Sequence, residues 1–157
     1  MVNHWLMKSE PDVYPWKQLV KEGTTHWDGV RNYQARNIMR DKMEIDDLVF
    51  FYHSNCKPPH IAGIAKVSKK AYPDFTAQDP KSKYFDPKAS PENPRWMMVD
   101  IEPILEIDPI GLPELKENPA LEGMPLLQRG QRLSVQPVST KHFSIVCKMA
   151  GIKNPPK

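Results

Sequence analysis

The residues best suited to chemistry lie between Trp27 and Arg36, a stretch that reads WDGVRNYQAR. It contains an indole, a carboxylate, two guanidiniums, an amide and a phenol. The Asp28-Gly29 pair predicts a turn, because glycine takes positive φ at no steric cost. Asn32 fits the N-cap of a following helix, whose free backbone N–H groups would lie beside the arginines. An anion site next to a flat ring suits a nucleotide, although a buried tryptophan, a capped helix and two solvated arginines explain the same residues.

Three more groups of polar residues lie at or beside the ends of predicted strands. They are Lys8-Ser9-Glu10, Tyr52 to Asn55, and Arg132 to Gln136. The second group follows a run, Leu48 to Phe51, that is apolar on both faces and therefore predicts a covered central strand. A buried strand that ends in hydroxyl, imidazole and amide groups is suited to read a polar ligand. Capping and turn chemistry explain Ser9 and Glu10 equally well.

The elements that must position these groups are short, as expected of a chain with 17 prolines in 157 residues. Strands are predicted over residues 3–8, 48–53, 60–68, 95–107 and 133–136, with the third returning antiparallel to the second. Helices are predicted over residues 16–22, 32–42 and 139–150, and short helical or turn pieces over 112–116 and 121–129. This order predicts an α+β fold built on a small mixed β-barrel, with peripheral short helices and a C-terminal amphipathic helix.

Particular positions within these elements carry their own expectations. Gly63 and Ala65 share one face of their strand, and the room they leave suits a closely packed neighbour better than a ligand. Pro103 lacks a donor N–H, so it predicts a bulge or an edge position. Burial in the core is the expected use of Trp16.

Length and composition set the outer limits. A chain of 157 residues is expected to form one domain, residues 1–157, without metal or disulfide support. The net charge of +3 permits an anionic partner without requiring one, so affinity for nucleic acid must come from a local patch. Cys56 and Cys147 form no CxxC pair, and no apolar run approaches the roughly 18 residues of a membrane span. We expect a soluble cytoplasmic protein, nuclear in a eukaryote, with no membrane partner; a monomer is the default, although the sequence leaves the oligomeric state open.

The common catalytic signatures are missing from the sequence. It has no GxxxxGK[ST], GxGxxG, HExxH or GxSxG motif, and its five histidines show no ligand spacing. We therefore assign no catalytic residue, no metal and no cofactor. An enzyme that acts on a nucleotide or a modified nucleic acid remains the alternative, with Glu10, Asp28 or Asp74 as acid or base. A third possibility is an adaptor for a partner protein, which would expose a contiguous apolar patch.

Five segments of the chain also resemble a known family. They are WLMKSEP at residues 5–11, WDGVRNYQARN at 27–37, FFYHSN at 50–55, YPD at 72–74 and RLSVQPV at 132–138. In this order and at this length they resemble the EVE-domain family, including its standalone members of bacterial type. The resemblance implies a PUA-like fold, shared with the PUA and YTH RNA-binding modules. It also implies a module that reads a modified base, such as methylated or hydroxymethylated cytosine, in DNA or in RNA.

The resemblance further implies which residues line the base pocket. They are Trp5, Lys8, Ser9, Trp27, Val30, Asn32, Tyr33, Arg36, Tyr52, His53, Ser54, Trp96, Arg132, Leu133 and Ser134. Trp27 would stack on an extruded base, with Trp5 or Trp96 as a second wall. The base edge would be read by backbone groups near Val30 and Leu133 and by the side chains of Asn32, Ser54 and Ser134. Arg36 and Arg132 would hold phosphate, assisted by Lys8. The loop over residues 76–94 matches nothing in the family, and its role is left open.

Overall fold

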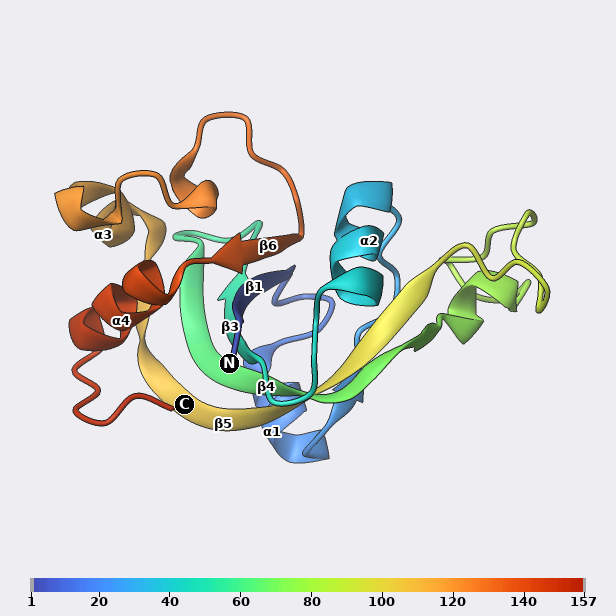
Figure 1. Cartoon of the computed structure of the whole chain (residues 1–157), viewed down its shortest axis with the longest axis horizontal. Coiled ribbons are helices and arrows are strands. Elements are labelled where there is room, and N and C mark those ends of the chain that lie inside the picture. The colour runs from blue at the N-terminus through green and yellow to red at the C-terminus, as the bar shows by residue number, and fades with distance from the viewer. Residues whose placement is uncertain (1, 157) are drawn as a thin grey trace.

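Six strands form one mixed sheet in the computed structural model, which describes residues 2–156. Their order across the sheet is β2-β5-β4-β3-β1-β6 (Figure 1). The strands are β1 (His4–Ser9), β2 (Thr25–His26), β3 (Leu48–His53), β4 (His60–Pro73), β5 (Met97–Gly111) and β6 (Val135–Val138). The helices are α1 (Trp16–Glu22), α2 (Tyr33–Asp41), α3 (Leu112–Glu117) and α4 (Thr140–Met149), with short 3-10 turns η1 (Phe75–Gln78), η2 (Pro119–Leu121) and η3 (Pro125–Leu127).

Strand β3 is central and buried along its whole length, as its apolar run predicts. It runs parallel to β1 and antiparallel to β4, so the predicted hairpin is confirmed. Because side chains alternate across a strand, Phe51 packs into one hydrophobic cluster and Phe50 into another. Helices α1 and α2 contribute to the first cluster, and α3 and α4 to the second, so each face of the sheet has its own helical cover.

The predicted barrel is present only in a loose sense. The α+β class and the mixed sheet are confirmed, but among residues 2–156 the outermost strands, β2 and β6, do not pair with each other. The sheet curls because β4 and β5 are long and bent (Figure 1). Their pairing shifts register at several points, and such bulges bend strands. One of these bulges lies at Pro103, where the sequence predicts it: Ala65 pairs with Pro103 while Ile64 pairs with Leu105.

Several boundaries differ from the predicted ones. The helical or turn piece predicted over residues 121–129 contains the end of η2 and all of η3, each of which starts at a proline and spans a single turn. Strand β6 begins later than predicted and includes Pro137, which an edge strand tolerates. The two-residue strand β2 is not predicted at all. No helix within residues 2–156 has both the length and the apolar character needed to cross a bilayer.

Trp16 and Gly63 explain how α1 is seated on the sheet. Trp16 is buried, as expected, and its indole donates to the carboxylate of Glu106 at 3.1 Å. A Cβ atom placed on Gly63 would lie only 2.4 Å from Cζ2 of Trp16. The indole therefore fills the room that the glycine leaves, and close packing rather than ligand binding is the use of this position.

Gly63→Ala is expected to lower the free energy of unfolding by about 1–3 kcal/mol, because the added methyl group overpacks the indole. Chemical denaturation measures this loss. In a double-mutant cycle with Trp16→Leu, which removes the clashing ring, the combined loss should be smaller than the sum of the single losses. Strict additivity would contradict the packing described here.

Candidate functional site

A cavity of about 1200 Å³ opens where strands β1 and β3 end. Its lining comes from residues 8–10, 13–14, 22, 25–31, 54–55, 83–84, 132 and 134. Three of the four polar groups singled out in the sequence meet here for a topological reason. In the parallel pair, Ser9 lies opposite His53, so the residues that follow each strand share one edge of the sheet. Strand β6 starts at the same edge, where the backbone N–H of Lys8 donates to the carbonyl of Ser134 at 2.8 Å.

Hydrogen bonds hold this edge together. The backbone N–H of Ser54 donates to the carbonyl of Ser9 at 3.0 Å, and the hydroxyl of Ser9 donates to the carbonyl of Tyr14 at 2.8 Å. The amide of Asn55 donates to the carboxylate of Glu10 at 2.9 Å. The rim is therefore a connected polar layer rather than a set of free loop ends.

Aromatic side chains line the cavity, but the Trp27 ring is largely buried behind its surface. Only 8% of Trp27 is exposed, since its ring packs edge-on against Phe51 with 5.5 Å between centroids. Its backbone N–H donates to the carbonyl of Val99 at 2.7 Å. Tyr14 and Tyr84, neither named from the sequence as a site residue, add further ring surface. A planar ligand in the cavity would thus meet part of the indole together with phenol rings.

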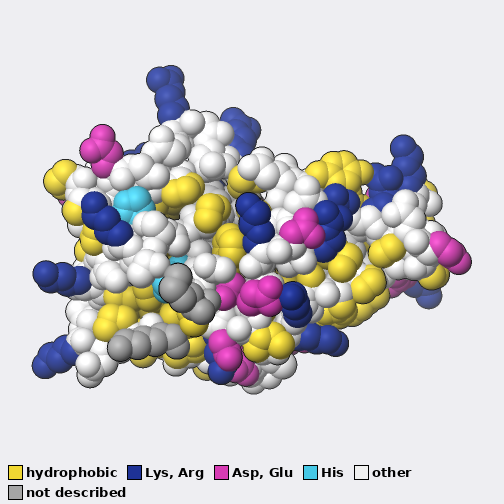
Figure 2. All heavy atoms as spheres, viewed as in Figure 1, with side chains coloured by type: hydrophobic (Ala, Val, Ile, Leu, Met, Phe, Trp, Pro, Cys, Tyr) yellow, Lys and Arg dark blue, Asp and Glu magenta, His cyan; other side chains and the backbone are white. Residues whose placement is uncertain are grey.

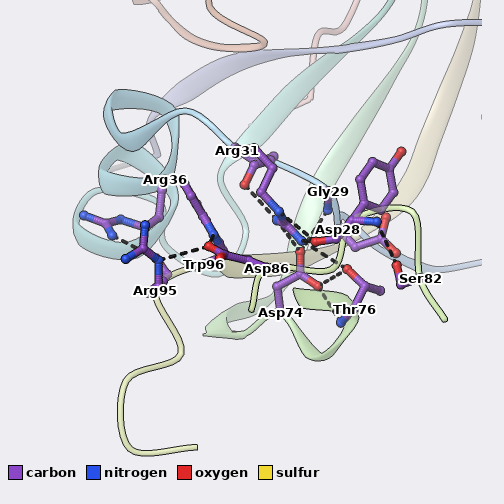
Figure 3. A network of polar contacts seen from close by, with 12 residues as sticks. Asp28, Gly29, Arg31, Arg36, Asp74, Thr76, Ser82, Asp86, Arg95 and Trp96 are labelled. Carbon is purple, nitrogen blue, oxygen red and sulfur yellow. Dashed lines mark hydrogen bonds and ion pairs between the residues drawn. The ribbon is translucent and has the colours of Figure 1, made fainter. Parts of the chain in front are cut away.

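Asp74 fixes the turn that carries Trp27 into the cavity. Its carboxylate is fully buried and accepts from the backbone N–H of Gly29 at 2.9 Å and from the guanidinium of Arg31 at 3.0 Å (Figure 3). It also accepts from the backbone and the hydroxyl of Thr76. The carboxylate of Asp74 therefore has a structural role as an anchor, and Asp74 does not line the cavity. Of the three carboxylates considered for acid–base chemistry, only Glu10 and Asp28 face it.

The long loop after η1 supplies part of the cavity wall. Lys83 and Tyr84 line it, and the carbonyl of Tyr84 accepts from Arg31 at 2.7 Å. The phenol ring lies directly on Gly29, where a Cβ atom would be 2.6 Å from the ring, and the φ of this glycine is +79°. The sequence left the role of this loop open. Its length was the one available signal, because long loops in small domains are usually functional or mobile.

The charges in the cavity are unevenly neutralised. Arg31 pairs with Asp74, whereas among residues 2–156 neither Lys8 nor Arg132 has a carboxylate within ion-pair distance. Burial lowers the pKa of Lys8. Burial, followed by the nearby Asp74 carboxylate, raises the pKa of Asp28, although His26 at 3.6 Å opposes this. The uncompensated positive charge at Lys8 and Arg132 suits an anionic ligand.

The structure brings together seven of the fifteen residues expected in the pocket. Those that line the cavity are Lys8, Ser9, Trp27, Val30, Ser54, Arg132 and Ser134. Trp5 and Tyr52 lie in the two hydrophobic clusters, and the indole of Trp5 donates to the buried Asp47 at 2.9 Å. Leu133 packs at the edge of the first cluster, and Asn32 caps α2 by accepting from the N–H of Ala35.

The remaining expected residues lie next to the cavity. His53 lies beneath the rim, where its Nε2 accepts from the N–H of Trp16 at 3.2 Å and its Nδ1 lies 3.3 Å from the carbonyl of Ser9. Tyr33, Arg36 and Trp96 form a separate cluster beyond Arg31. Base binding by any of these fifteen residues stays a prediction.

The sequence and the fold match one family. A family model described as the EVE domain matches residues 3–149. Human thymocyte nuclear protein 1 is 39% identical over 168 aligned residues, which cover 94% of this chain and 73% of that protein. A solved hypothetical protein from Leishmania major is 46% identical, with a TM-score of 0.91 and 96% of each chain covered. The human THYN1 protein, solved in complex with 5-methylcytosine-containing DNA, is 41% identical, with a TM-score of 0.85 and coverage of 98% of this chain and 99% of that chain.

Asp74→Ala is expected to lower the free energy of unfolding by about 3 kcal/mol, because it leaves Arg31 and the N–H of Gly29 without their acceptor. Chemical denaturation measures the loss. Asp108→Ala is the matched control, since Asp108 is exposed, and it should change stability by at most about 0.5 kcal/mol. Equal effects of the two substitutions would show that Asp74 is no anchor.

Acid should destabilise the rim through His53. Burial lowers the pKa of His53 below its usual 6.5, so the unfolded state binds protons more readily than the folded state. Stability should therefore fall as the pH drops through about 6.5, and His53→Gln should flatten this slope. His4, whose pKa is also lowered, contributes with the same sign and remains in the variant. Unfolding at a series of pH values provides the measurement; an unchanged slope in the variant would refute the role of His53.

Proposed function

The protein belongs to the EVE-domain family, and we propose that it is a non-catalytic module that binds nucleic acid by holding one modified base in its cavity. We also take residues 1–157 as a single EVE domain. The cavity carries the proposal, because it combines aromatic walls with two cations, Lys8 and Arg132, that have no carboxylate within ion-pair distance among residues 2–156. The human relative solved with 5-methylcytosine-containing DNA supports the choice of ligand. Such a reader would act wherever its nucleic acid lies, in the cytoplasm or, in a eukaryote, the nucleus.

The size of the cavity suits an extruded nucleotide with some of its backbone. About 1200 Å³ exceeds the roughly 300–1,000 Å³ typical of small-molecule pockets. In this arrangement the base lies against Trp27 and Tyr84, while Lys8 and Arg132 hold the flanking phosphates. Ser54 and Ser134 also line the cavity, and in this arrangement their hydroxyls hydrogen-bond to the base edge. Extrusion favours bases that cost little to unstack or that fill the cavity well.

Asp28 gives the cavity a preference for cytosine. A carboxylate accepts a hydrogen bond from the exocyclic amino group of cytosine, which thymine and uracil lack. Asp28 lines the cavity and is partly buried, so a contact there is shielded from water. We therefore expect 5-methylcytosine and 5-hydroxymethylcytosine, rather than modified thymine, among the bases that bind.

Equilibrium binding to a panel of oligonucleotides tests the proposal. The panel holds one sequence with a single 5-methylcytosine, 5-hydroxymethylcytosine, cytosine or thymine, as DNA and as RNA. A modified cytosine should bind most tightly, with a shallow dependence on salt because few phosphates are contacted. A steep salt dependence without preference among the bases would indicate adhesion by charge alone and would overturn the proposal.

Arg132→Gln should weaken binding to the preferred oligonucleotide by about tenfold and reduce the salt slope by about 1, because one phosphate contact is lost. Arg129 lies three positions earlier, and its side chain is exposed and outside the cavity. Arg129→Gln removes the same charge there, so it should change neither the affinity nor the salt slope appreciably. Fluorescence anisotropy over a salt series measures both. Similar losses in the two variants would mean that Arg132 acts only through net charge.

The enzyme alternative is favoured by one observation, the raised pKa of Asp28 in a cavity, which is typical of a general acid or base. The two functions differ in what Asp28→Asn does. A reader should lose about fivefold in affinity for methylated DNA, because a neutral acceptor replaces a charged one, and no product should form with either protein. An enzyme should form a product that mass spectrometry detects with the unmodified chain, and the variant should bind but not react.

A further inference from the structure

A cluster of aromatic and basic side chains, which we call the Tyr33 platform, lies outside the cavity. It consists of Tyr33 and Arg36 from α2, together with Arg95 and Trp96 just before β5. Residues far apart in the sequence thus meet on one surface. Figure 2 shows basic side chains beside exposed hydrophobic ones on the face that carries α2 and the loop after η1.

Tyr33 offers an exposed ring backed by a buried one. Its ring stacks on that of Trp96, with 4.8 Å between centroids and 22° between planes. Trp96 is only 5% exposed, whereas Tyr33 is 49% exposed. The guanidinium of Arg36 lies 4.6 Å from the Tyr33 ring and 5.9 Å from the Trp96 ring. A guanidinium on the face of Tyr33 opposite Trp96 would lie much farther from the Trp96 ring than 5.9 Å. The Arg36 guanidinium therefore lies to one side of the Tyr33 ring, and the outer face of this ring stays open.

The platform is held rigid by Asp86, which accepts from the guanidinium of Arg95 at 3.0 Å and from the indole of Trp96 at 2.7 Å (Figure 3). Arg95 also donates to the hydroxyl of Tyr33 and has a φ of 63°, a conformation that arginine rarely adopts. An exposed ring that is fixed in this way loses little entropy when a flat ligand stacks on it.

One positive charge on the platform has no carboxylate partner. Asp86 pairs with Arg95, whereas the hydrogen bonds of Arg36 within the described part of the chain go to the carbonyl of Arg95 and the amide oxygen of Asn37. Within residues 2–156 no carboxylate lies at ion-pair distance from Arg36. An exposed aromatic ring beside a guanidinium whose charge no described carboxylate pairs with fits a nucleotide, the base on the ring and the phosphate on the cation.

Arg31 joins the platform to the cavity. It lines the cavity, and its guanidinium carbon lies 5.4 Å from the Trp96 ring (Figure 3). Tyr33 follows Arg31 by two positions in the chain, and the Tyr33 ring and the Arg31 guanidinium both contact the Trp96 ring. We propose that Tyr33 stacks on the base next to the one held in the cavity, while Arg36 holds the phosphate. This inference rests on the proposed function of the cavity and adds a contact that is independent of the modification.

The test compares two probes, 5-methyl-2′-deoxycytidine 5′-monophosphate and a short single-stranded DNA with one internal 5-methylcytosine, alongside its unmodified form. Tyr33→Ala should weaken binding of both DNAs by about tenfold, within the range for one base stacked on an aromatic ring, and should leave their affinity ratio unchanged. Binding of the mononucleotide should not change, because it reaches only the cavity. Tyr33→Phe, which keeps the ring, should bind DNA like the unmodified chain.

Arg36→Gln provides a second arm that does not depend on the ring. It should weaken DNA binding severalfold and reduce the salt slope, whereas Arg40→Gln, one turn further along α2 and paired with Asp41, should not. If Tyr33→Ala proves to be unfolded in a thermal melt, Arg36→Gln decides the question.

The outcomes separate the platform from the cavity. Unchanged DNA binding in Tyr33→Ala and Arg36→Gln, with the preference for methylated DNA intact, overturns the platform alone. Loss of mononucleotide binding in these variants also overturns it, because the cluster would then only support the cavity wall. If the unmodified chain binds DNA through Tyr33 without preferring the methylated base, the cavity proposal fails and the stacking contact stands.

Discussion

Asp74 is fully buried and binds two segments that are distant in the sequence, the turn at Gly29–Arg31 and the start of η1 at Thr76. A buried carboxylate is stable only when its charge is paired and its oxygens accept hydrogen bonds. The site depends on this constraint, because the turn presents Trp27, Asp28 and Val30 to the cavity while Arg31 carries the long loop through the carbonyl of Tyr84. Asp74 thus adds an attachment to η1 to the direct contacts that Gly29 and Arg31 make with Tyr84.

The topology of the sheet determines what meets at the cavity. Strand β3 is covered on both faces, so its polar end is the first place where its chain reaches solvent. Because β1 is parallel to β3 and β6 is antiparallel to β1, three polar segments emerge at one edge of the sheet. The curled pair β4 and β5 then brings the loop after η1 against the turn of Gly29. A ligand site between these segments is therefore a consequence of strand direction and curvature, and its specificity is a matter of the side chains at the rim.

Much of this architecture could be predicted from local patterns. The apolar run of β3, the hairpin to β4, the cap Asn32 and the bulge at Pro103 each follow from short-range chemistry. The extension of β4 to Pro73 and of β5 to Gly111 could not be predicted, because each strand stabilises polar residues of the other through pairing. Strand β2 is too short to show any periodicity.

The sequence also could not predict which of the expected site residues line the cavity and which lie elsewhere. Trp27 and Tyr33 are close in the chain, but the turn and the start of α2 direct one into the cavity and the other to the outer surface. Tyr52 is adjacent to His53, yet strand alternation sends it into the second hydrophobic cluster. The contact of Tyr84 with Gly29 could not be predicted, because the two residues lie 55 positions apart in the sequence.

The most direct test of the cavity as the base-binding site is a nuclear magnetic resonance titration of the isotope-labelled chain with methylated single-stranded DNA. The account predicts that the largest amide shifts fall on residues 8–10, 27–31, 54–55, 83–84 and 132–134, and that unmodified DNA shifts the same residues less at equal concentration. Shifts confined to surfaces away from these segments, or shifts identical for the two DNAs, would contradict it.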